Sequence, residues 1–166
     1  MTGRVKLTHV DEAGRARMVD VADKQVSARS AVAEGAIRMS REAFQLIADG
    51  EVAKGDVLSV SEIAGTLAAK RTAELIPLCH PLGLDHIEVE STLDGELPGV
   101  RVRVAAKTVG RTGVEMEALT AVSVALLAVY DMVKSVDRGM EIHGVHLVEK
   151  TGGRRGDWRR NDTSHA

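Results

Sequence analysis

The segment Thr112–Lys134, TGVEMEALTAVSVALLAVYDMVK, decides the fold, because it predicts one long helix. Thr112 and Glu115 have the spacing of a capping box, in which two side chains satisfy the first free amides of a helix. Gly139 is a natural stop signal beyond the other end. The apolar residues recur at three- and four-residue steps, which is typical of a helix face packed on a core: Met116, Leu119, Val122, Leu126, Val129 and Val133.

Chemically reactive side chains lie at both ends of this helix. Glu115 and Glu117 fall in its first turn, where the helix dipole favours anions. Asp131 and Lys134 are one turn apart near the other end, so their side chains can meet. About 14 residues separate Glu117 from Asp131, a distance of roughly 21 Å along a helix axis. One small ligand cannot touch both ends, so either the ends serve different sites or a second subunit brings its opposite end alongside. We therefore expect a homo-oligomer.

The composition limits the possible functions. A chain of 166 residues with 44% hydrophobic and 28% charged residues suits one globular domain. Aromatic residues make up only 2%, which argues against a protein that stacks single-stranded bases, and a net charge of -2 gives no general attraction to nucleic acid or anionic membranes. The single cysteine, Cys79, excludes an internal disulfide framework and fits a reducing compartment. With no run long enough for a membrane span and no signal core in Met1–Val10, we expect a cytoplasmic protein without nucleic-acid or membrane partners.

The rest of the chain predicts a mixed fold. A strand falls within Val19–Met39, and a hairpin follows from the alternation around Ile87–Leu93 and Val100–Ala106. A last strand covers Ile142–Glu149. The order of strands and helices predicts an α+β domain with a four-stranded antiparallel sheet, ferredoxin-like in topology, and helices on one face. We expect one domain over residues 1–166, with a flexible arm at 1–17 and a flexible tail at 151–166.

Two shorter helices are expected between the first strand and the hairpin. Ser40 caps a helix over Arg41–Asp49, which Gly50 ends, and Asp56 caps a second helix from Val57 to about Leu75. The second helix has apolar residues at the spacing of a packed face: Val60, Ile63, Ala64 and Leu67.

The pair Asp131 and Lys134 is the sharpest candidate for chemistry. Such a pair on an exposed helix is usually a weak surface ion pair. Its apolar neighbours Met132 and Val133 favour partial burial instead, and a partly desolvated lysine loses its proton more easily. The pair is therefore a candidate acid–base unit.

A constrained turn holds the second candidate, Cys79-His80. Pro77 and Pro81 flank it, which excludes helix and fixes the direction of the imidazole. A loop histidine bonded to the backbone explains the pattern equally well. His86, six residues on, could join His80 in a zinc site, but zinc is disfavoured, because the chain has one cysteine and lacks CxxC or HxxxH spacing.

Two lysines are candidate contacts for an anion. Lys54 precedes Gly55 and the start of a helix, but the segment does not match a P-loop, and a solvated loop lysine is the simpler explanation. Lys150 leaves the last strand just before Gly152 and Gly153, where a glycine turn with nearby arginines suits a polyanion or a disordered basic tail equally.

Several long motifs resemble the MoaC family, the cyclic pyranopterin monophosphate synthases of molybdenum cofactor biosynthesis. The similarity runs from about Leu7 to Trp158 and misses no key position. The motifs that carry it are LTHVDEAGRARMVDV, KGDVL, IAGTLAAKRTAELIPLCHPL, TGVEMEALTAVSVALLAVYDMVK and KTGG.

The resemblance implies an activity, an assembly and a set of site residues. The family converts (8S)-3',8-cyclo-7,8-dihydroguanosine 5'-triphosphate to the cyclic pyranopterin and expels pyrophosphate, as a lyase. It forms a hexamer, a trimer of dimers, with sites at the dimer interface. By this resemblance Asp131 is the catalytic acid or base and Lys134 its partner. The implied substrate-binding residues are Leu78, Cys79, His80, Met116, Glu117, Glu115, Lys54, Arg29 and Lys150.

Two alternatives from other classes stay open on the residues alone. One is a non-catalytic nucleotide-binding or sensor module of the same fold, which would bind nucleotide without forming product. The other is a structural assembly protein whose charged pairs serve only subunit contacts. We expect no resident cofactor or metal, with Mg²⁺ accompanying the triphosphate at most.

Overall fold

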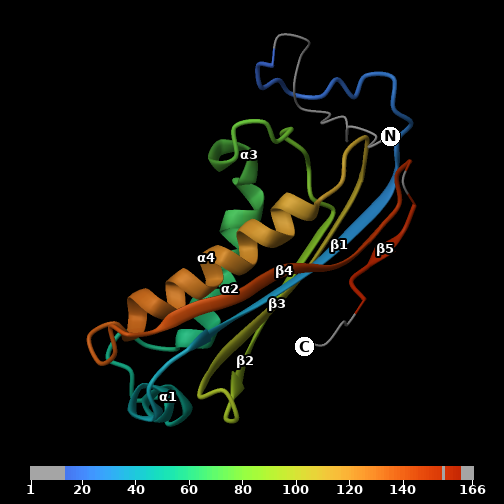
Figure 1. The fold of residues 1–166 in the computed structure, drawn as a ribbon. Helices are drawn as coiled ribbons and strands as arrows, with labels where there is room; N and C mark the ends of the chain where they lie inside the picture. The colour runs from blue at the N-terminus through green and yellow to red at the C-terminus, as the bar shows by residue number, and fades with distance from the viewer. Residues whose placement is uncertain (1–13, 155, 162–166) are drawn as a thin grey trace.

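In the computed structural model, which describes residues 14–154 and 156–161, one antiparallel sheet carries a layer of helices on one face (Figure 1). The strand order is β2-β3-β1-β4-β5, and neighbouring strands are all antiparallel. The α+β class and the ferredoxin-like arrangement are therefore as expected. The elements, in chain order, are β1 (Ser27–Arg38), α1 (Arg41–Ala48), α2 (Val57–Lys70), α3 (Thr72–Leu75), β2 (His86–Asp94), β3 (Gly99–Gly110), α4 (Glu115–Val133), β4 (Glu141–Thr151) and β5 (Trp158–Arg159).

The sheet has five strands where the sequence predicts four. The fifth, β5, pairs with β4 through Glu149 opposite Arg159 and Lys150 opposite Trp158, inside the segment expected to be a free tail. A two-residue strand leaves no periodic pattern in a sequence, so it is invisible to an argument from alternation. The expected arm at 1–17 lies largely outside the described residues.

The hairpin and both helix caps agree with the sequence. Asp94 pairs with Gly99 where β2 turns into β3, and its Oδ1 accepts the amides of the turn. The Ser40 hydroxyl accepts the Ala43 amide at the start of α1. Asp56 Oδ1 accepts two amides at the start of α2. These local signals fix where elements begin, and the long-range packing decides the rest.

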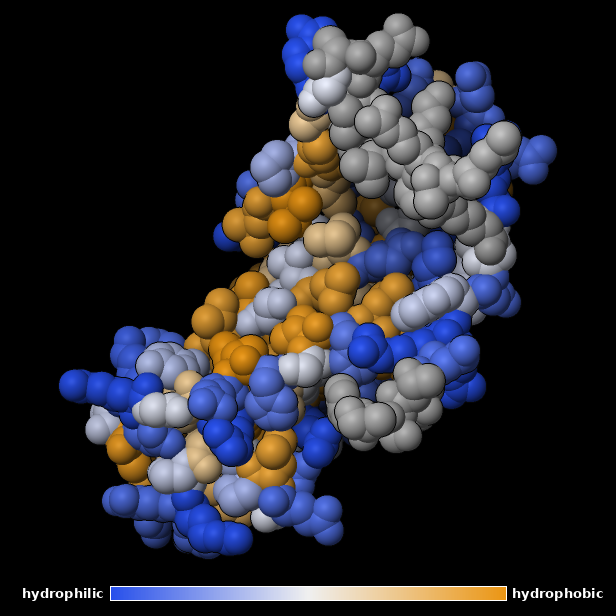
Figure 2. Space-filling model, viewed as in Figure 1, coloured by the Kyte–Doolittle hydropathy of each residue, from blue (hydrophilic) through white to orange (hydrophobic). Residues whose placement is uncertain are grey.

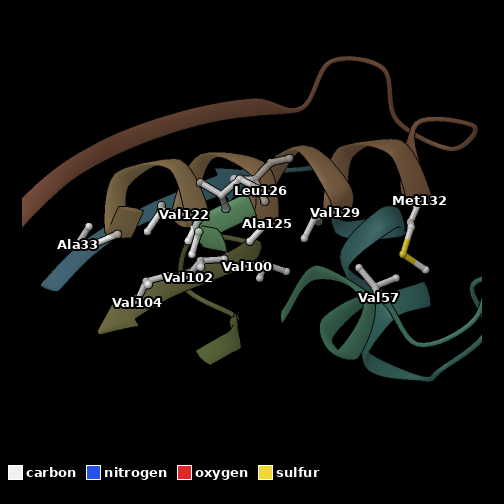
Figure 3. Packing of buried hydrophobic residues seen from close by; sticks show 14 of the residues in the cluster. Ala33, Val57, Val100, Val102, Val104, Val122, Ala125, Leu126, Val129 and Met132 are labelled. Atoms are coloured by element: carbon white, nitrogen blue, oxygen red, sulfur yellow. The ribbon is translucent and has the colours of Figure 1, made fainter. Parts of the chain in front are cut away.

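The long helix α4 lies across the sheet and forms the centre of the core. Small and β-branched residues fill the space between helix and sheet, which suits a chain that is nearly free of aromatic rings. By length and composition α4 could cross a membrane, but 56% of its most apolar window is buried inside the protein, as in the core helix of a domain. Figure 3 shows the side chains between α4 and β3, among them Val122, Ala125, Val129, Val100 and Val102.

The predicted capping box at the start of α4 is wrong. The helix begins at Glu115 with Val114 at the N-cap position, and no side chain bonds the free amides there. Glu115 instead turns its carboxylate to Lys150 on β4, 3.0 Å away. The Glu115 side chain, which the local pattern assigned to the helix cap, therefore forms a tertiary ion pair instead.

The predicted packed face of α2 is also wrong. Ile63 is 60% exposed and Leu67 52% exposed, while the buried face carries Ser61, Gly65 and Ala68. An added Cβ at Gly65 would lie 3.1 Å from the Ala121 carbonyl oxygen of α4, so the two helices approach through small residues. Apolar side chains of the helical layer are left at the surface, in the band that Figure 2 shows across the middle of this face.

Candidate functional site

The carboxyl end of α4 carries a carboxylate between two lysines. Lys134 Nζ lies 2.7 Å from Asp131 Oδ1. Lys54 Nζ donates to Asp131 Oδ2 at 2.8 Å and to the Asp131 carbonyl oxygen at 2.7 Å. Each carboxylate oxygen therefore faces a different ammonium group, and we call these three residues the carboxyl-end cluster.

The loop before α2 delivers Lys54 to this cluster. Gly55 has a φ of +99°, a backbone conformation that side chains with a Cβ rarely adopt, and its amide donates to the Val52 carbonyl at 2.9 Å. Asp56 then caps α2 and fixes the direction in which the chain leaves. The motif Lys54-Gly55-Asp56 thus combines a cation, a tight turn and a helix start, although its sequence does not match a P-loop.

The electrostatics of the cluster differ from the expectation of a partly buried pair. Asp131 and Lys134 side chains are 57% and 53% exposed. The hydrogen bond from Lys134, followed by that from Lys54, lowers the pKa of Asp131 to about 2. The hydrogen bond and charge of Asp131 raise the pKa of Lys134. In this chain the pair is therefore held as carboxylate and ammonium, and the expected easy loss of the lysine proton is wrong.

The amino end of α4 buries a second carboxylate. Glu117 is only 3% exposed, and burial raises its pKa. The thiol of Cys79 lies 3.6 Å from Glu117 Oε1 and donates to it. No donor among the described residues reaches the buried Oε2 atom. Burial, and next the charge of Glu117, raises the pKa of Cys79 to about 11, so at neutral pH the sulfur keeps its proton.

The turn between Pro77 and Pro81 brings His80 to the same end. Its Nε2 lies 2.7 Å from the Val19 carbonyl oxygen, in the segment that leads into β1. Further along, the Thr108 hydroxyl donates to the Gly83 carbonyl at 2.7 Å and ties the turn to β3. The histidine therefore has the backbone partner that the simpler interpretation expected, and it lies beside the other candidates as well.

Two cations complete this end of the molecule. Lys150 Nζ lies 3.0 Å from Glu115 Oε1, and Arg29 Nε donates to the Gly110 carbonyl at 3.0 Å. Gly153 packs so closely on Arg29 that an added Cβ would lie 2.5 Å from Arg29 Nη1. The glycine turn after β4 thus supports the guanidinium.

The structure sorts the eleven predicted residues into two groups at opposite ends of α4. The carboxyl-end cluster holds Lys54, Asp131 and Lys134. The remaining residues lie at the other end, and we call them the amino-end cluster: Arg29, Leu78, Cys79, His80, Glu115, Met116, Glu117 and Lys150. Leu78, which is half-buried, and Met116, which is exposed, lie at the border of this cluster. The predicted separation of the two helix ends is therefore real within one chain.

Two partners in the amino-end cluster were missed by the sequence argument, the carbonyls of Val19 and Gly110. Backbone acceptors have no residue signature, so no pattern could have found them. Two surface hollows lie elsewhere: one on the open face of the sheet beside Arg103 and His146, the other between α2 and β2 beside Ile63. Neither includes a residue of the two clusters.

Comparison with known proteins gives one consistent result. A model of the MoaC family matches residues 18–153. A protein of Brucella ovis called cyclic pyranopterin monophosphate synthase is 57% identical over 157 residues, which is 95% of either chain. A protein of the same name from Cereibacter sphaeroides is 59% identical over 150 residues, or 90% of this chain and 94% of the relative. The matches include both clusters.

Proposed function

Since the chain belongs to the MoaC family, we propose that it converts (8S)-3',8-cyclo-7,8-dihydroguanosine 5'-triphosphate to cyclic pyranopterin monophosphate with release of pyrophosphate. It is thus an enzyme of molybdenum cofactor biosynthesis, and the alternative of a non-catalytic nucleotide-binding module is not favoured. The geometry that supports this function best is the carboxylate of Asp131 held between the ammonium groups of Lys54 and Lys134.

The charges of this cluster support a direction for the first proton transfer. Rearranging the guanine-derived rings requires several proton transfers, which positioned side chains supply. Asp131, with a pKa of about 2, is a poor base at neutral pH. Lys134 holds its proton firmly until the carboxylate is drawn away from it. In our proposal Lys134 first acts as an acid and Asp131 orients it. Substrate binding draws the carboxylate away from the lysine, which lets Lys134 release its proton.

The phosphates of the substrate require cations close by, because a protein with a net charge of -2 has no overall attraction for anions. Besides Lys134, the clusters bring the cations Lys54, Arg29 and Lys150, and His80 lies among them. Fixed positive charges stabilise the charge that develops on a leaving pyrophosphate. Glu115 and Glu117 complement them, because carboxylates accept hydrogen bonds from the N–H edge of a guanine-type ring.

The separation of the clusters supports a site shared by two subunits. At roughly 1.5 Å per residue, the two ends of α4 are too far apart for one small substrate. A two-fold axis across the middle of α4 would place the carboxyl end of one helix beside the amino end of the other, which makes two identical sites. The exposed apolar residues Ile63 and Leu67 on α2 offer further surface for assembly. A hexamer built as a trimer of dimers agrees with both features.

The remaining parts of the proposal concern the setting of the enzyme. The partner is a small-molecule substrate, and we propose a cytoplasmic enzyme with no membrane or nucleic-acid partner. Mg²⁺ would arrive with the triphosphate, since oxygen-rich phosphates are its usual ligands. A resident cofactor is not part of the proposed mechanism.

The test is turnover of the cyclised dihydroguanosine triphosphate by the purified protein. Pyrophosphate release and the fluorescent oxidised pterin are both measured, for wild type, Lys134→Ala and Lys107→Ala. Lys107 is an exposed lysine on β3, outside both clusters, and is the matched control. Loss of an acid–base group lowers rates by roughly 10²–10⁴-fold, so Lys134→Ala should fall in that range while Lys107→Ala keeps full rate.

Two other results would contradict the proposal. Nucleotide binding by wild type without either product would leave a binding module of the same family. Full turnover by Lys134→Ala would remove the lysine from the chemistry. Gel filtration of the same variants separates a third case: a Lys134→Ala protein that is inactive only because its oligomer has fallen apart would indicate an assembly role.

A further inference from the structure

The two oxygens of the Glu117 carboxylate have unequal surroundings. Oε1 accepts the thiol of Cys79 at 3.6 Å, whereas Oε2 is buried and has no donor among the described residues. Buried carboxylate oxygens are normally hydrogen-bonded, because the unpaired group has lost its contact with water. The Oε2 atom can therefore accept a hydrogen bond from a donor outside this chain.

The thiol has one proton and two acceptors within reach. Glu117 Oε1 lies 3.6 Å from the sulfur, and the carbonyl oxygen of His80 lies at 3.9 Å. The carboxylate is the nearer acceptor and carries charge, so it forms the stronger bond. The Cys79 amide donates to the Ile76 carbonyl at 3.0 Å, which holds the backbone from which the sulfur projects. The thiol can therefore orient the carboxylate.

We propose that Cys79 is a positioning residue that acts through Glu117: its S–H bond holds Oε1 so that Oε2 is presented to an N–H donor of the guanine-derived ring. Cys79 then influences substrate without forming the contact itself. The identity of the ring donor rests on the proposed function. The thiol–carboxylate bond does not, and it is measurable without substrate.

The first experiment detects the bond by infrared spectroscopy of the S–H stretch. The chain has one cysteine, so one band belongs to Cys79. A hydrogen bond to a carboxylate lowers the stretching frequency, and in Glu117→Gln, whose amide oxygen is a weaker acceptor, the band should move to higher frequency. Glu117→Ala removes the acceptor and should move it further. Circular dichroism confirms that each variant is folded. Coincident bands in the wild type and both variants would overturn the proposal.

The second experiment tests whether Cys79 acts through Glu117. A thiol is a weak hydrogen-bond donor, so its bond to the carboxylate is expected to contribute about 0.5–1.5 kcal/mol, and Cys79→Ala should lower kcat/KM by roughly 2- to 13-fold. Cys79→Ser, which keeps a donor, should recover part of that loss. In a Glu117→Gln background the same Cys79→Ala change should cause little further loss, since the group it positions is already altered. Losses that multiply in the double variant would mean that Cys79 contacts substrate directly, and would overturn the proposal.

The two experiments separate this proposal from the proposed function. A wild type that is inactive on the cyclised triphosphate, but whose S–H band shifts in Glu117→Gln, keeps the thiol–carboxylate bond and refutes the reaction. An active wild type with no band shift keeps the reaction and refutes the positioning role.

Discussion

The packing of α2 on α4 is tested by adding a side chain at Gly65. A Cβ at this position would lie 3.1 Å from the Ala121 carbonyl oxygen, 3.1 Å from Val89 Cγ1 and 3.3 Å from Ala125 Cβ. Carbon atoms pack best at about 3.5–4.0 Å, so three neighbours must move at once, and one of them is helix backbone. Gly65→Val adds two further methyl groups to the same space.

The expected loss of stability follows from two opposing effects. Overpacking a filled core costs about 1–3 kcal/mol. Removing a glycine from a helix interior offsets part of this, by about 0.5–1 kcal/mol. We expect Gly65→Val to lower the free energy of unfolding by about 2 kcal/mol. At a typical urea dependence of about 2 kcal/mol per molar, the unfolding midpoint should fall by about 1 M.

The control is Ala64→Val, one position along the same helix. Ala64 is half-buried and is not among the buried residues of α2, so this change reports mainly the helix propensity of valine. Both variants and the wild type are unfolded at one protein concentration, because an oligomer would make the midpoint depend on it. If Gly65→Val is no less stable than Ala64→Val, α2 does not pack on α4 through its small residues and the described helix pair is incorrect.

Three further predictions concern single positions. Gly152 has a φ of +80°, and an added Cβ would collide with the Ala28 carbonyl oxygen. Gly152→Ala should therefore lower the free energy of unfolding, measured in urea, by at least about 1 kcal/mol. An unchanged unfolding midpoint would contradict the tight turn. The raised pKa of Cys79, about 11, predicts slow alkylation at pH 8. Glu117→Gln removes the charge that raises this pKa and weakens the hydrogen bond, so alkylation should speed up, although burial still holds the pKa above its ordinary value. Equal alkylation rates in the two proteins would argue against the contact. Asp131 has a pKa of about 2 against an ordinary 3.8, so the stability contributed by its ion pairs is complete above pH 3.8 and is lost as pH falls towards 2. An NMR titration of the Asp131 carboxyl carbon, identified by its absence in Asp131→Asn, should show a midpoint of about 2. A midpoint near 3.8 would contradict the lysine contacts.

Local signals in the sequence located most of the elements. The side chains of Ser40 and Asp56 act over two or three residues, so their caps could be assigned without knowledge of the fold. The hairpin followed from alternation and turn residues in the same way. The face of α2 could not be predicted, because apolar spacing marks both a core and a surface that meets another chain. Only the position of α4 shows that Gly65 is at the contact and Ile63 is outside it.

The site shows the same division between local and long-range information. The contact of Asp131 with Lys134 is a matter of helix spacing and was predictable. The addition of Lys54 depends on a loop that is distant in sequence, and the pKa directions depend on the exposure of the whole cluster. Burial of Glu117 against Cys79 likewise arises from tertiary packing. The resemblance to the family supplied these residues, and the structure supplies their surroundings.

The two-cluster arrangement has a physical consequence for all of the proposed chemistry. Lys134 belongs to the carboxyl-end cluster and Glu117 to the amino-end cluster, so in the proposed shared arrangement a variant at either position would damage only one half of each site. Subunits with different damage can complement each other when they exchange partners, whereas a site within one chain cannot be repaired in this way.

The most direct test of a shared site is therefore to mix Lys134→Ala subunits with Glu117→Ala subunits, in which the carboxylate is removed entirely, after dissociation and reassociation. In a two-fold dimer, half of the randomly formed pairs are mixed, and each mixed pair contains one intact site, so turnover should return to about one quarter of the wild-type level. Each variant reassociated alone should stay inactive. No recovery in the mixture, with mixed oligomers verified by mass spectrometry, would contradict a catalytic site assembled from the opposite ends of α4 in two subunits.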